Sequence, residues 1–258
     1  GLSALLLVSA VLEGYASSLT GYIIAFFSSL LAACIITAFT IRTAHLVGLI
    51  LFGFVIGFLT QAIGITSDLW CYNRTFIFAA FSWSLAAVTM EGISRIVRYK
   101  LKSLTDHPLN VLVVLALLGT LPVTLALQDH WKYAKYRPTP GEWMMRQESG
   151  LKGACFINQE MPAKSKLEPN EPFWIYYISL AGFAILMQAR LPFTELLSLI
   201  LAAWIMGGIS EWMGATAKLW HFRTVAFPPL FLVLGCWPLE FLVIRGLATR
   251  MKGSETIQ

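Results

Sequence analysis

Residues 46–70 read LVGLILFGFVIGFLTQAIGITSDLW, and residues 196–220 read LLSLILAAWIMGGISEWMGATAKLW. At an offset of 150, without gaps, the wider stretches 29–70 and 179–220 match at twelve of forty-two positions. Leucine matches arise easily by chance in an apolar chain, whereas matched glycines, threonines and tryptophans do not. The informative pairs are Gly57/Gly207, Gly64/Gly214, Thr66/Thr216, Leu69/Leu219 and Trp70/Trp220. The chain is therefore predicted to be duplicated, with its functional site between the two halves.

The composition is that of a membrane protein. Hydrophobic residues make up 57% of the chain and charged residues only 13%, and the mean hydropathy is +0.68. A helix that crosses a hydrocarbon core of about 30 Å needs roughly twenty apolar residues. Seven stretches are long enough: about 19–41, 45–65, 76–97, 109–127, 173–190, 194–214 and 225–247. We expect an all-α membrane protein with about seven transmembrane helices.

These helices divide into two three-helix repeats with one helix between them. Because a single linking helix returns the chain to its starting side, the repeats should be parallel, about an axis along the membrane normal. It stays open whether the first residues belong to an eighth helix. The predicted order is an N-terminal segment (1–18), repeat 1 (19–97), a linking segment (98–127), an extramembrane loop (128–172), repeat 2 (173–247) and a C-terminal tail (248–258).

The basic residues predict the orientation. One side carries most of them: Arg42, Arg95, Arg98, Lys100, Lys102, Arg190, Arg245, Arg250 and Lys252. The short loops of the other side carry Arg74, Lys218 and Arg223. By the positive-inside rule the first side is cytoplasmic, which places the loop 128–172 on the non-cytoplasmic side. That proline-rich loop is either an interfacial segment anchored by its aromatic residues or a lid over a site.

Motifs for bound metals, cofactors or nucleic acid are missing from the sequence. The four histidines and four cysteines form no ligand pattern. Cys71 and Cys155 both fall on the predicted outer side, so a disulfide between them stays open. There is no glycine-rich phosphate loop, no nucleophile elbow and no basic stripe. We expect no metal, no cofactor and no nucleic-acid partner; membrane lipid is the expected surrounding.

Three acidic residues fall within predicted membrane helices: Glu91, Glu211 and Glu240. A charged carboxylate at bilayer depth costs at least about 2–3 kcal/mol, so such residues usually face the bundle interior. A buried carboxylic acid among aromatic rings can protonate a carbon–carbon double bond, and the rings stabilise the resulting carbocation. The alternative is structural, because Arg95 and Arg245 follow Glu91 and Glu240 closely enough for intrahelical ion pairs.

The two repeats also match at these acids. Gln61 falls opposite Glu211 at the offset of 150, and Glu91 falls opposite Glu240 if one residue of slippage is allowed. We therefore expect Glu91 and Glu240 to lie at corresponding depths and to share one largely apolar compartment. Pro238 should bend the last helix, because it removes a backbone donor and clashes with the carbonyl group of Leu234.

Two motifs in each repeat resemble a known family. Residues 214–222 read GATAKLWHF and residues 235–242 read GCWPLEFL, while the first repeat has LWCY at 69–72 and TME at 89–91. This pattern is similar to the integral-membrane lycopene cyclase domain, with its Trp-x-Tyr motif followed by Pro-Leu-Glu in each of two three-helix units. The resemblance covers most of residues 19–247. Phe241 and Gly92 stand where that family usually has a second acid, and its proline after Trp-x-Tyr is missing.

The resemblance implies proton-initiated cyclisation, hydration or isomerisation of a hydrophobic isoprenoid or carotenoid, without redox change. Glu240 would be the proton donor, Glu91 its partner or the terminal base, and Glu211 an auxiliary acid. The cavity would be lined by Trp70, Tyr72, Trp220, Phe222 and Gln61. The alternative is a non-catalytic accessory or scaffold subunit that binds lipid, quinone or pigment among other membrane subunits. Few polar residues fall at mid-membrane, which disfavours a transporter of hydrophilic substrates.

Overall fold

The structure is a computed structural model that describes residues 19–67, 69–72, 77–101, 110–135, 171–188, 191–216, 220–222 and 230–253. These residues are almost entirely helical, which confirms the all-α class. The elements, in chain order, are α2 (Leu19–Ala38), α3 (Thr43–Thr66), β1 (Trp70–Tyr72), α4 (Ile77–Lys100), α5 (Asn110–Lys135), α6 (Glu171–Gln188), α7 (Phe193–Thr216), β2 (Trp220–Phe222), the π-helical turn η2 (Leu232–Cys236) and α8 (Trp237–Gly253).

Several helix ends differ from the prediction. Helix α5 continues to Lys135, past the expected boundary at 127, and α8 continues to Gly253, past 247. Polar residues after each apolar run extend the helix, because solvated residues add backbone hydrogen bonds without needing an apolar face. The N-terminal segment 1–18, most of the loop 128–172 and Cys155 lie outside the described residues, and so do the expectations made for them.

The surface is apolar and much of the polar side-chain content is buried. Among the described residues, three helices are long and apolar enough to cross a membrane: Thr43–Thr66, Phe193–Trp212 and Leu232–Met251. Leu186 is 74% exposed and Ile36 is 65% exposed, whereas Gln188 and Glu240 are at most 1% exposed. Many other large apolar side chains of the described helices are exposed as well. The distribution is typical of helices that face lipid.

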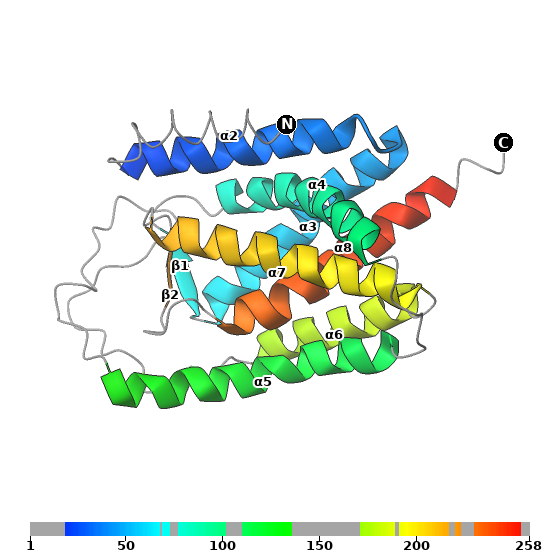
Figure 1. Cartoon of the computed structure of the whole chain (residues 1–258). Coiled ribbons are helices and arrows are strands. Elements are labelled where there is room, and N and C mark those ends of the chain that lie inside the picture. The colour runs from blue at the N-terminus through cyan, green and yellow to red at the C-terminus, as the bar shows by residue number, and fades with distance from the viewer. Residues whose placement is uncertain are drawn as a thin grey trace.

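Two short strands pair at one end of the bundle, where α3 and α7 end (Figure 1). They run antiparallel in the register Trp70↔Phe222, Cys71↔His221 and Tyr72↔Trp220. Shifting each residue by 150 positions converts the pair Trp70↔Phe222 into Trp220↔Tyr72, which is the other outer pair. A twofold axis through the central Cys71–His221 pair produces this register.

Deeper in the bundle, two tryptophans meet between glycine-bearing helices. The rings of Trp83 on α4 and Trp237 on α8 stack with centroids 4.1 Å apart. Gly57 on α3 faces Trp83, and Gly207 on α7 faces Trp237, each with no room for a Cβ atom. The glycines are 150 residues apart and the tryptophans 154. The two halves therefore pack tightly where they meet.

The last helix has a π-helical turn just before Pro238, where we expected a bend. The backbone N–H of Trp237 donates to the carbonyl oxygen of Leu232, five residues back, so the helix is wider over η2. Pro238 has no N–H to donate to Leu234. The Leu234 carbonyl instead accepts a hydrogen bond from the indole Nε1 of Trp204 at 3.1 Å. The local rearrangement is thus stabilised by a tryptophan on α7.

Candidate functional site

The buried acid Glu240 lies in the first turn of α8 and is fully buried. The hydroxyl group of Thr60 on α3 donates to its Oε1 at 2.8 Å, and Tyr177 on α6 donates to the same oxygen at 2.6 Å. The carboxyl group thereby joins helices from both predicted repeats. Two neutral hydroxyl donors on one oxygen fix its orientation without introducing a counter-charge.

A second tyrosine extends this group into a chain of hydrogen bonds. The hydroxyl oxygen of Tyr176 lies 2.9 Å from Thr60 Oγ1 and 3.3 Å from the carbonyl oxygen of Ile56. The one proton of the Thr60 hydroxyl goes to Glu240, and the one proton of the Tyr176 hydroxyl is shared between the Ile56 carbonyl oxygen and Thr60 Oγ1. Tyr176 therefore contacts Glu240 only through Thr60, while Tyr177 donates to Glu240 directly.

The other carboxyl oxygen of Glu240 has no such partner. Glu240 Oε2 is buried and makes no hydrogen bond within the described part of the chain. Tyr177, which donates to Glu240, belongs to a cluster of aromatic rings: its ring centroid is 4.7 Å from that of Phe173 and 5.0 Å from that of Tyr176. An acid with one oxygen fixed and the other unbonded is arranged to deliver a proton from the unbonded oxygen.

Glu211 and Gln61, the predicted equivalents, each accept a hydrogen bond from a buried indole. Trp237 Nε1 donates to Glu211 Oε1 at 2.8 Å, and Trp70 Nε1 donates to Gln61 Oε1 at 3.0 Å. Trp70 is only 4% exposed, because its ring packs against Gly64. Tyr72, Trp220 and Phe222 are described only through their strand pairing, and their side chains lie outside the described part.

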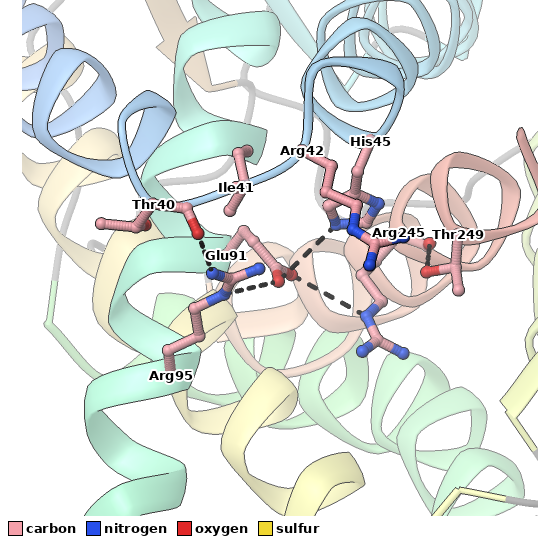
Figure 2. Close-up of a pocket in the computed structure, with 8 residues that line it drawn as sticks. All are labelled: Thr40, Ile41, Arg42, His45, Glu91, Arg95, Arg245 and Thr249. Atoms are coloured by element: carbon pink, nitrogen blue, oxygen red, sulfur yellow. Dashed lines mark hydrogen bonds and ion pairs between the residues drawn. The ribbon is translucent and has the colours of Figure 1, made fainter. Parts of the chain in front are cut away.

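Glu91 lies in a separate polar cluster (Figure 2). Arg95 Nε donates to Glu91 Oε1 at 3.0 Å, which confirms the pair expected four residues apart on one helix. His45 Nε2 lies 3.6 Å from the same oxygen, and Arg245 Nε lies 3.8 Å from Oε2. A carboxylate facing two guanidinium groups is suited to balancing charge and poorly suited to donating a proton.

The expected Glu240–Arg245 ion pair is wrong, because Arg245 pairs with Glu91 and Glu195. Its Nη2 donates to Glu195 Oε1, and Arg98 Nη1 lies 2.7 Å from the other oxygen of Glu195. The side chain of Arg245 is only 14% exposed. It therefore balances two carboxylates that come from α4 and α7.

The contacts after the strands favour a pairing of the halves different from the one expected for Glu91 and Glu240. The stacked Trp83 and Trp237 are 154 residues apart. The same spacing separates Gly92, which faces Thr37, from Gly246, which faces Met187. At this offset Glu91 corresponds to Arg245. The segment from Trp220 to Trp237 is four residues longer than the segment from Trp70 to Trp83. An alignment that allows only one residue of slippage does not accommodate this difference.

The two acids, expected to share one compartment, lie in separate surroundings. Glu240 corresponds to Ala86 at an offset of 154, and their hydrogen-bond partners have no member in common. Glu240 contacts hydroxyl groups inside the bundle, whereas Glu91 lines a pocket with arginines at the end opposite the strands. Glu240 has uncharged hydrogen-bond partners, whereas Glu91 is ion-paired with arginines.

The pocket beside Glu91 has a volume of about 270 Å³. It is lined by Thr40, Ile41, Arg42, His45, Glu91, Arg95, Arg245 and Thr249 (Figure 2). Within the described ranges, no three His, Cys, Asp or Glu side chains are grouped to hold a metal ion. Cys34 and Cys236 are buried free thiols. No family model, curated protein or solved structure matches this chain.

Proposed function

We propose that the chain crosses the membrane about seven times as two parallel three-helix units, α2–α4 and α6–α8, with α5 linking them. The symmetric strand register and the Trp83–Trp237 stack support this arrangement. The arginine-rich end would face the cytoplasm, and the strand pair and the segment after Lys135 would face the other side. The axis between the units would then pass close to Glu240.

We further propose that the protein modifies an isoprenoid, such as a carotenoid or polyprenyl chain, and that Glu240 is the acid. The observation that carries this proposal is a fully buried carboxyl group with one oxygen held by Thr60 and Tyr177 and the other unbonded. Full burial away from water, with no arginine or lysine among its hydrogen-bond partners, disfavours the carboxylate and so favours the protonated acid that this chemistry needs. The resemblance to lycopene cyclases in the Pro-Leu-Glu motif at residues 238–240 agrees with it.

The reaction would begin when the Glu240 proton forms a C–H bond at one carbon of a double bond. The other carbon of that double bond becomes cationic, and a second double bond attacks it to close a ring. A proton lost from the ring to the Glu240 carboxylate then restores a double bond and the acid. The product is an isomer of the substrate, and no electrons are gained or lost overall. The rings of Phe173, Tyr176 and Tyr177 would stabilise the cation. Glu211 remains the proposed auxiliary acid, whereas Glu91 is removed from the chemistry by its ion pairs.

We expect Glu240→Gln to reduce turnover at least about a hundredfold, the usual contribution of a general acid. The amide keeps the shape of the side chain and removes its acidic proton. The measurement is isomer formation from lycopene, squalene and geranylgeraniol by the reconstituted chain. Glu171→Gln is the matched control, because Glu171 is exposed at the start of α6 and should leave turnover unchanged. Equal turnover by both variants would rule out Glu240 as the acid.

A second candidate function is that of an accessory subunit without catalysis. The observation that favours it is the close packing at the centre, where Gly57 and Gly207 bring two stacked tryptophans between the units. Wild-type chain that turns over no isoprenoid, and that co-purifies stoichiometrically with other membrane subunits, would favour this function. Turnover of a purified single chain would exclude it.

A further inference from the structure

The pocket beside Glu91 contains more positive than negative groups. Three arginines line it, Arg42, Arg95 and Arg245, with His45 beside them, and Glu91 is its one carboxylate among the described residues. Glu195 does not line the pocket, and it forms ion pairs with Arg98 and Arg245. Counting both acids and all four arginines, the cluster keeps two positive charges uncompensated. Such an excess in a concave site attracts an anion.

Two buried nitrogen atoms at this pocket have no hydrogen-bond partner in the described part of the chain: Arg245 Nε and His45 Nδ1. Buried polar atoms in folded proteins nearly always have a partner, so each such atom calls for an explanation. Glu91 Oε2 lies 3.8 Å from Arg245 Nε, which is too far for a hydrogen bond, and it too is buried without a partner among the described residues. An anion with a protonated oxygen, such as hydrogen phosphate, would supply an acceptor for Arg245 Nε and a donor for Glu91 Oε2.

Arg42 is an exposed cation of this pocket. It occupies the N-cap position of α3, its side chain makes no capping bond, and it joins no ion pair with another described residue. Figure 2 shows its side chain extending toward Arg245. The start of α3 adds the free N–H groups and the positive end of a 24-residue helix to the same place. Arg42 is therefore available for a ligand.

We propose that this pocket binds a phosphate-type anion, through Arg42, Arg95 and Arg245. Guanidinium groups bind phosphate oxygens in pairs, and a helix N-terminus favours the same charge. The ligand is either the headgroup of an acidic lipid or a soluble phosphate. The pocket lies at the arginine-rich end of the bundle, where a headgroup would lie if these helices cross a bilayer. This inference does not depend on chemistry at Glu240.

The test uses the full chain in nanodiscs of phosphatidylcholine and follows its thermal unfolding. Inorganic phosphate is titrated in one arm, and phosphatidate is added to the discs in the other. Sodium chloride at equal ionic strength controls for screening. Arg42→Gln is the pocket variant, and Arg250→Gln is its matched control, because Arg250 is exposed on α8 and does not line the pocket.

We expect phosphate or phosphatidate to raise the unfolding temperature of the wild type. Arg42→Gln should need about tenfold more ligand for the same rise, as for the loss of one charged hydrogen bond, and Arg250→Gln should behave like the wild type. A rise with phosphate in neutral discs assigns a soluble anion, and a rise with phosphatidate alone assigns a headgroup. The proposal is overturned if neither ligand acts, if chloride acts equally, or if the two variants respond alike.

Discussion

Arg245→Met should destabilise the protein by about 3–5 kcal/mol, the cost of leaving buried charges without their partner. Arg245 contacts Glu91 on α4 and Glu195 on α7, and its side chain is 14% exposed. Methionine keeps much of the side-chain volume, so the loss reports charge rather than packing. The measurement is the free energy of unfolding in mild detergent. Arg250→Met, on the exposed side of the same helix, should change it by less than about 0.5 kcal/mol.

The rescue of this variant separates charge from shape. Glu91→Gln and Glu195→Gln added to Arg245→Met remove the uncompensated charges, so the triple variant should recover a large part of the lost stability. If the single variant is as stable as the wild type, the ion pairs that join α4, α7 and α8 do not stabilise the fold. Loss without any rescue would instead mean that packing of the long arginine side chain matters.

Gly57→Ala should destabilise the protein by roughly 3 kcal/mol, at the upper end of the range for overpacking. A Cβ atom at Gly57 would overlap the Cβ and Cγ atoms of Trp83. The Cβ atom of Trp83 is fixed to the backbone of α4, so α3 and α4 must separate and the stack with Trp237 must shift. Both thermal unfolding and near-ultraviolet circular dichroism of the tryptophans should report the change.

Gly182→Ala is the matched control for this substitution. Gly182 lies within α6, and a Cβ atom there would meet nothing within 4 Å. Alanine favours the helix over glycine by up to about 1 kcal/mol, so this variant should be as stable as the wild type or slightly more stable. If Gly57→Ala behaves in the same way, the tight contact between the units does not stabilise the fold.

The all-α class and the local pair of Glu91 with Arg95 were predictable from the sequence, because each depends on composition or on spacing within one helix. The partners of Arg245 were not predictable, since Glu91 and Glu195 reach it from other helices. An arginine five residues after Glu240 suggested a local pair instead. Long-range packing decided between the two possibilities.

The surroundings of Glu240 show the same limit. Thr60, Tyr176 and Tyr177 are uncharged and lie in apolar runs, so nothing in their local sequence distinguishes them from core residues. Two adjacent tyrosines within an apolar helix were the one available signal. The offset of 154 between Trp83 and Trp237 was not visible in the sequence. The matches at an offset of 150 end at Trp70 and Trp220, before the segment whose length differs.

Reaction in D₂O tests the role of Glu240 most directly. The carboxyl proton exchanges with solvent, so a proton-initiated reaction must place deuterium on carbon at the site of protonation. We predict that the wild-type chain in liposomes converts lycopene, or another acyclic isoprenoid, to an isomer that carries one deuterium for each ring formed. Glu240→Gln should give no labelled product. Unlabelled product, or labelled product formed equally by Glu240→Gln, would contradict the proposed function.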